Sequence, residues 1–68
     1  MRTMEKKHEL IVYAMDGGKV IRKASFDTAD EAWETQKKWL MEDADIFVER
    51  INDGYTMTFL CQQDILED

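Results

Sequence analysis

The segment DTADEAWETQKKWLMED, residues Asp27 to Asp43, is the one long stretch of the chain with a helical period, and it decides the fold. Small and apolar residues recur in it at intervals of three and four, which places them on one stripe of a helix. The stripe consists of Ala29, Ala32, Trp33, Gln36 and Leu40, with Trp39 at its edge. Its small residues would let the helix lie close to a sheet. We expect the one polar member, Gln36, to bond a backbone group at the edge of that sheet.

The start of this helix has a clear signal, whereas its end does not. Thr28 followed by Glu31 fits a capping box, in which each side chain bonds the other residue's backbone N–H. At the other end, Glu42 and Asp43 add negative charge where the helix dipole is already negative. We therefore expect the helix to fray after Met41.

Runs of β-forming residues lie on both sides of the helix. Before it, residues 8–15 (HELIVYAM) and 20–26 (VIRKASF) are joined by DGGK, a sequence that tolerates the positive φ of a tight hairpin. After it, residues 45–51 (DIFVERI) and 55–61 (YTMTFLC) are joined by NDG. The pattern predicts an α+β fold of order ββαββ, with one helix packed on one face of a four-stranded antiparallel sheet.

Two spatial orders of the strands fit this pattern. The order 2-1-3-4 makes all neighbours antiparallel, centres the most apolar strand and puts the strand with Lys and Arg at an edge, where charge discourages stray pairing. The order 1-2-3-4 would require a right-handed crossover between parallel strands. We favour 2-1-3-4.

Alternation along the last strand separates its side chains into two rows. The threonines form one row, and the larger apolar side chains form the other. We expect the apolar row to lie under the helix, against Trp33 and Leu40. The residues of that row are Tyr55, Met57, Phe59 and Cys61.

A single helix leaves the second face of the sheet uncovered. The first and third strands are apolar on both faces, so the uncovered face keeps an apolar patch of the kind that marks interfaces. This predicts self-association into a homodimer through Ile11, Tyr13 and Met15.

The length of 68 residues predicts one domain with a modest core. We expect residues 1–7 to be mobile, while the short acidic tail, residues 62–68, either adds one helical turn or stays loose. The single cysteine, Cys61, excludes an internal disulfide and fits a reducing compartment. The longest apolar run, residues 10–15, is too short to cross a membrane. These features predict a cytoplasmic protein.

No catalytic constellation is visible in the sequence. His8 and Cys61 have no spacing that requires them to meet, and Cys61 is expected in the core. The acidic run Glu42, Asp43 and Asp45 lacks the glycine and the ligand spacing of a calcium loop. We therefore predict no enzymatic activity, no cofactor and no metal.

Basic residues concentrate near the first hairpin and raise the alternative of nucleic-acid binding. They would form a strip consisting of Lys6, Lys7, His8, Lys19, Arg22 and Lys23, with Tyr13 among them. The net charge of −6 opposes it, because a nucleic acid would be repelled. Direct binding of nucleic acid is not expected.

The acidic balance leads instead to interaction with another protein. Residues 1–26 carry six basic and three acidic groups, whereas residues 27–68 carry three basic and twelve acidic groups, a net −9. We predict a non-catalytic interaction module, a small acidic inhibitor or regulator. In size and charge it resembles small virus-encoded inhibitors, including anti-CRISPR proteins and DNA mimics, and the resemblance lies in composition alone. The partner-binding candidates are Asp30, Glu31, Glu34, Glu42, Asp43, Asp45 and Glu49.

Overall fold

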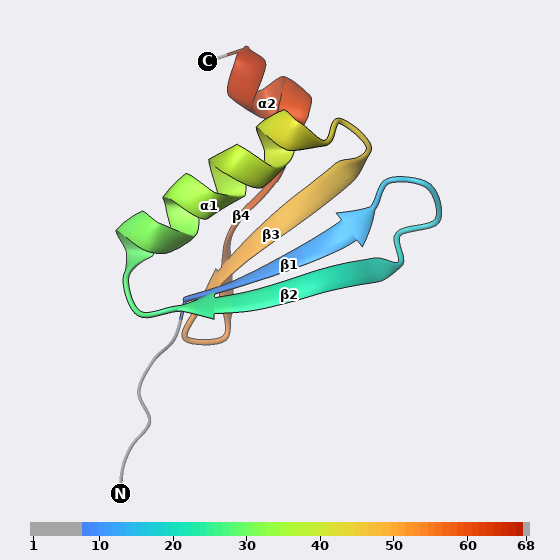
Figure 1. The fold of residues 1–68 in the computed structure, drawn as a ribbon. Helices are drawn as coiled ribbons and strands as arrows, with labels where there is room; N and C mark the ends of the chain where they lie inside the picture. Colours follow the sequence, from blue (N-terminus) through green and yellow to red (C-terminus); the bar gives the residue numbers. More distant parts are fainter. Residues whose placement is uncertain (1–7, 68) are drawn as a thin grey trace, which may run out of the picture.

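The computed structural model describes residues 8–67 of the chain, so the predicted mobile start lies outside the described residues. The elements follow in the order β1 (His8–Ala14), β2 (Val20–Phe26), α1 (Ala29–Glu42), β3 (Ile46–Asn52), β4 (Tyr55–Cys61) and α2 (Gln62–Leu66). The strands form one antiparallel sheet in the order β2-β1-β3-β4, and α1 lies across one of its faces (Figure 1). The predicted ββαββ fold and the strand order 2-1-3-4 are confirmed.

Both hairpins turn where the sequence supplies residues that tolerate a positive φ. The first turn uses Gly17 and Gly18, with φ of 93° and 71°. The second uses Asp53 and Gly54, with φ of 55° and 82°. Two successive positive φ values give the turn the right-handed twist of its flanking strands.

Helix α1 begins where the capping signal predicts. The hydroxyl of Thr28 accepts a hydrogen bond from the backbone N–H of Glu31 at 3.2 Å. The helix ends at Glu42, one residue beyond the expected point of fraying. There Asp43 Oδ1 accepts a hydrogen bond from the backbone N–H of Asp45 at 2.8 Å, so the acidic run stabilises the turn that leaves the helix.

The core lies between α1 and the two central strands. Its buried apolar residues are Leu10, Val12, Ala32, Leu40, Ile46 and Val48. Gln36 lies among them with 0% exposure. Its Nε2 donates to the carbonyl of Val48 at 2.8 Å, and its Oε1 accepts from the hydroxyl of Thr58 at 3.1 Å. The predicted backbone partner is confirmed, but it belongs to the central strand β3 instead of an edge strand.

The predicted inward row of β4 is wrong. Tyr55, Met57 and Phe59 are 73%, 51% and 51% exposed. Thr58 and Leu60 turn toward the helix in place of Met57 and Phe59. Alternation separates two rows but does not say which one faces inward. Here Thr58 turns inward and donates to the buried amide of Gln36, whereas a register shift leaves Thr56 on the other face, bonded to Glu49.

Trp33 and Cys61 were also expected in the core. Both are half-buried, and neither belongs to the buried core. Trp33 lies at the margin of α1, where Lys37 and Arg50 approach its ring at 5.5 and 5.9 Å. Cys61 pairs with Phe47 on the far face of the sheet. The burial of Leu40 is as predicted.

The acidic tail forms one short helix, α2, beside the C-terminal end of α1 (Figure 1). Asp64 caps it by accepting from the backbone N–H of Cys61 at 2.8 Å. The amide of Gln62 donates to the carbonyl of Leu40 at 2.8 Å, and Ile65 packs on the core. Neither helix among residues 8–67 is long and apolar enough to cross a membrane.

Candidate protein-interaction surfaces

One face of the sheet has no helix over it, and we call it the open face. The strand register places its side chains in three rows that run from β2 across β1 and β3 to β4. The rows are Val20–Tyr13–Phe47–Cys61, Lys23–Ile11–Glu49–Phe59 and Ser25–Glu9–Ile51–Thr56. None of these residues is buried. The open face is therefore a broad apolar surface with three charged groups.

An aromatic cluster occupies one part of the open face. The rings of Phe47 and Phe59 stack with centroids 5.2 Å apart, and Tyr13 meets Phe59 edge-on at 5.6 Å. Such pairs stabilise one another beyond their shared burial, which keeps the rings in place. The cluster is therefore an ordered surface, and it includes Tyr13, one of the predicted self-association residues.

Of those predicted residues, Ile11 and Tyr13 lie on the open face, as their strand alternation requires. Met15 follows the end of β1 and is 42% exposed, and its backbone N–H donates to the carbonyl of Asp45 at 3.0 Å. The structure thus places two of the three on one surface and the third at its border.

Glu49 lies at the centre of the open face and is held by two neighbours. Its Oε1 accepts from the hydroxyl of Tyr13 at 2.8 Å, and its Oε2 accepts from the hydroxyl of Thr56. The hydrogen bond to this carboxylate raises the pKa of Tyr13 above its usual value, with partial burial and the negative charge adding to the effect. Among the described residues, Glu49 has no cation within ion-pair distance.

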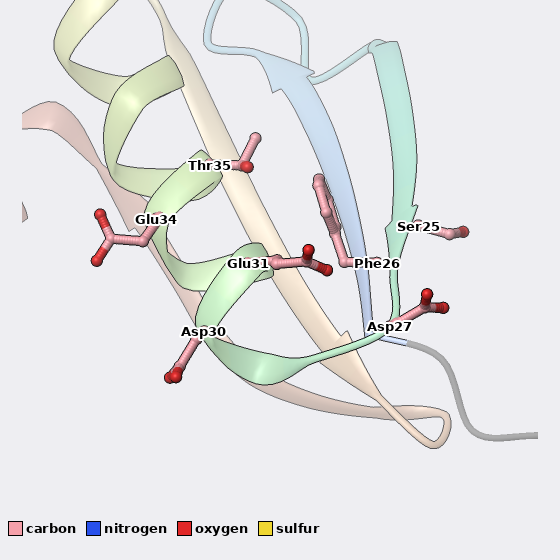
Figure 2. Close-up of a pocket in the computed structure, with 7 residues that line it drawn as sticks. All are labelled: Ser25, Phe26, Asp27, Asp30, Glu31, Glu34 and Thr35. Carbon is pink, nitrogen blue, oxygen red and sulfur yellow. The ribbon is translucent and has the colours of Figure 1, made fainter.

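A second surface is an acidic groove between β2 and the first half of α1. It has a volume of about 510 Å³ and is lined by Ser25, Phe26, Asp27, Asp30, Glu31, Glu34 and Thr35. Figure 2 shows the carboxylate of Glu31 projecting from α1 toward the ring of Phe26, while Asp30 and Glu34 point to the outer side of the helix. The groove thus combines an aromatic wall, which Glu31 faces, with a rim on which Asp27, Asp30 and Glu34 lie.

The predicted partner-binding acids separate into three places. Asp30, Glu31 and Glu34 line the acidic groove. Glu34 forms an ion pair with Lys37, whose Nζ lies 3.4 Å from its Oε2. At the other end of α1 lies the group Glu42, Asp43 and Asp45.

Glu49, the remaining partner-binding candidate, joins neither group. It follows the buried Val48 directly in β3, so alternation directs its side chain to the opposite face of the sheet from α1. The two remaining groups are separated by roughly 16 Å along the helix, at about 1.5 Å per residue from position 31 to position 42.

The predicted basic strip is divided between the two faces. Arg22 lies on the helix side, with its guanidinium 4.3 Å from the ring centroid of Trp39, whereas Lys23 pairs with Ile11 on the open face. Lys6 and Lys7 lie outside the described residues. Successive residues of a strand point to opposite faces, so Arg22 and Lys23 do not share one surface.

The two candidate nucleophile and base residues are far apart. His8 pairs with Asn52 at one end of β3, and Cys61 pairs with Phe47 at the other end. No group of three or more His, Cys, Asp or Glu residues within 8–67 is arranged to hold a metal ion.

Two features of these surfaces were not predicted from sequence. Asp27 and Phe26 contribute to the acidic groove although they lie in the loop and strand before the helix. Phe59 joins the aromatic cluster although its row was assigned to the core. The acidic residue directly before the helix cap was the available signal for the first. No local signal marked the second, because the row of Phe59 depends on the hydrogen bond between Thr58 and Gln36 on another element.

Comparison with protein-family models, with curated proteins and with solved structures finds no match to this chain. The two surfaces therefore carry the functional argument.

Proposed function

We propose that the protein is a non-catalytic interaction module, a small acidic regulator or inhibitor that binds a basic surface of another protein. The observation that carries this proposal is the acidic groove, in which the carboxylate of Glu31 projects toward the ring of Phe26 and three further acidic residues line the surface. Such a groove suits a cationic side chain that lies its apolar stem on the ring and directs its charged end to the rim.

The charge of the whole chain supports the same partner. The net charge of −6 attracts a basic protein over distances greater than one contact and accelerates its association. Basic surfaces of this kind are typical of proteins that bind nucleic acids. In that case the carboxylates of the groove compete with phosphates for Lys and Arg, as a virus-encoded antagonist of a host defence protein would.

The test uses a matched pair of variants with equal changes in charge. Glu31→Gln with Glu34→Gln removes two negative charges at the groove, and Asp16→Asn with Glu67→Gln removes two that lie elsewhere. Proteins captured by the wild-type chain from its native host are identified, and the affinity of the captured protein for each variant is measured across a salt series.

We expect the groove variant to bind at least roughly tenfold more weakly, mainly through slower association, and the control to change binding by less than about threefold. The wild-type affinity should also decrease steeply with added salt. Equal effects of the two variants, or an affinity that does not depend on salt, would remove the acidic groove from the mechanism.

A further inference from the structure

The acidic groove lies beside the point at which the described part of the chain begins. β1 starts at His8, which pairs with Phe26, the residue that forms the aromatic wall of the groove. Paired residues of antiparallel strands have their Cα atoms about 5 Å apart. Residues 1–7 are therefore joined to the sheet one strand away from this wall.

The groove is acidic, whereas the sequence of residues 1–7 is basic. The lining of the groove holds four acidic residues and no lysine or arginine. Among residues 8–67, no cation lies within ion-pair distance of Asp30 or Glu31. Residues 1–7, MRTMEKK, carry three basic groups and one acidic group, a net charge of +2. The chain thus has cations of its own next to carboxylates that its described residues do not pair.

We propose that residues 1–7 occupy the acidic groove of the same chain when no partner is bound, and so act as a tethered competitor for it. Lys6 or Lys7 lays its apolar stem on the ring of Phe26 and directs its ammonium group to the carboxylate of Glu31, which projects toward that ring (Figure 2). The contact concerns the chain alone, whereas its regulatory consequence rests on the proposed function.

The length of residues 1–7 is sufficient for this contact. Seven extended residues span at most about 23 Å, at ~3.3 Å per residue. Along α1 the groove extends from Asp30 to Thr35, a rise of roughly 8 Å at ~1.5 Å per residue. The rest of the length covers the path from His8 around the start of the helix. A tether this short holds its cations near the groove at an effective concentration of about millimolar.

The contact is weak and reversible, because exposed ion pairs contribute little to stability and are screened by salt. We expect residues 1–7 to exchange between the groove and the solvent, which agrees with the mobile start predicted from the sequence. The apparent affinity of a partner then falls in proportion to the fraction of molecules in which the groove is free. Residues 1–7 therefore set how basic a partner must be to bind.

The first experiment measures paramagnetic relaxation enhancement in the chain without a partner. Cys61→Ala removes the one cysteine, and Thr3→Cys supplies the site for a nitroxide spin label. We expect the amide signals of Glu31 and Thr35 to be broadened at least about twofold more than those of residues 53–56. Residues 53–56 follow Asn52, which pairs with His8 on its other side, so they are the reference for a segment without preference.

A matched pair of variants in the labelled chain tests the charges. Lys6→Gln with Lys7→Gln should reduce the broadening at the groove by at least roughly half, as should added salt. Lys19→Gln with Lys23→Gln removes the same charge at exposed positions away from the groove and should change it by much less. Dispersed amide spectra check that each variant is folded. In the unlabelled wild-type background, the first pair should also shift the amide signal of Glu31 more than the second.

Equal broadening on the two sides of His8, or equal effects of the two pairs of variants, would overturn the proposal and leave the acidic groove as a partner site without a competitor. The second experiment tests the regulatory consequence. Lys6→Gln with Lys7→Gln should bind the captured partner at least roughly twofold more tightly than Lys19→Gln with Lys23→Gln, because the groove is free more often. Equal affinities would show that the segment does not regulate the groove. A groove that binds residues 1–7 but no partner would contradict the proposed function alone.

Discussion

The two faces of the sheet have similar apolar content but differ in how far their side chains are buried. On the helix side, Leu10, Val12 and Val48 are almost completely buried. On the open face, Phe47, Phe59 and Ile51 are at least as large, yet none is buried. The difference shows that burial in this small fold depends on what lies over a strand more than on how apolar its side chains are.

The strongest test of this comparison removes one large side chain from each side of the sheet. Leu40→Ala should lower the free energy of unfolding by about 3 kcal/mol, because it leaves a cavity in a core of few residues. Phe59→Ala should cost about 1 kcal/mol, because the ring is half exposed and loses mainly its aromatic contacts. Urea unfolding at low protein concentration measures both. Equal costs would mean that the open face is as important to the monomer as the core.

The buried amide of Gln36 offers a second test of the helix side. Gln36→Ala should lower the free energy of unfolding by about 2 kcal/mol, because it leaves a cavity and removes the hydrogen bonds to Val48 and Thr58. The partial variant Thr58→Val removes only the second bond and should cost about 1 kcal/mol. Chemical unfolding of the wild type and the two variants measures the three free energies of unfolding. A Gln36→Ala variant as stable as the wild type would contradict the stabilising role of this amide.

Two neighbouring residues of β2, Arg22 and Lys23, allow the two faces of the sheet to be compared through a smaller effect on stability. Arg22→Met removes the guanidinium from the ring of Trp39 and should cost about 0.5 kcal/mol, as expected for an exposed cation–π pair. Lys23→Met, one residue along on the open face, should leave the stability of the monomer unchanged within error. Thermal unfolding at low concentration compares them, and a larger effect at Lys23 would reverse the assignment of faces.

The smallest expected effect concerns the titration of Tyr13. Its phenol donates to Glu49, so the pKa lies above 10.0 in the folded protein. A raised pKa stabilises the fold below the unfolded pKa, and this contribution is lost as pH rises through the folded pKa. Glu49→Gln should move the pKa of Tyr13 down toward 10.0. Ultraviolet titration in a Tyr55→Phe background isolates Tyr13, and an unchanged pKa would mean that Glu49 does not hold the phenol.

Sequence patterns predicted the elements of the fold well because each has a local cause. The period of three and four residues, the threonine cap and the glycine turns depend on neighbours within a few positions. The order of the strands followed from charge on the β2 edge and from the apolar character of β1. These signals agree with one another in the sequence, and the structure has all of them.

The assignment of faces in β4 failed because its cause is not local. The inward orientation of Thr58 and Leu60 depends on Gln36, which lies 22 residues before Thr58 and accepts its hydrogen bond. A register shift between Arg50 and Ile51 also breaks the simple alternation near Met57. Sequence counting cannot show which row meets a buried amide on another element.

The candidate surfaces were predictable to different degrees. The acids of the groove share one helix, so their proximity followed from helical spacing. The separation of Glu49 from the other acids follows from its position directly after the buried Val48 in β3. The open face was foreseen as an apolar surface, but its aromatic cluster needs Phe59, whose row had been assigned to the core.

The strand order also has a consequence for how the chain reaches its native state. Each hairpin joins residues close in sequence, whereas the β1–β3 ladder joins partners such as His8 and Asn52, 44 positions apart. Closing that loop costs more chain entropy than forming either hairpin, so we expect formation of the β1–β3 ladder to limit the rate of folding. We expect Val12→Ala, in this ladder, to retard refolding in stopped-flow experiments more than Ala24→Gly in the outer hairpin strand. In this view the two hairpins form fast, and pairing of β1 with β3 joins them into one cooperative unit.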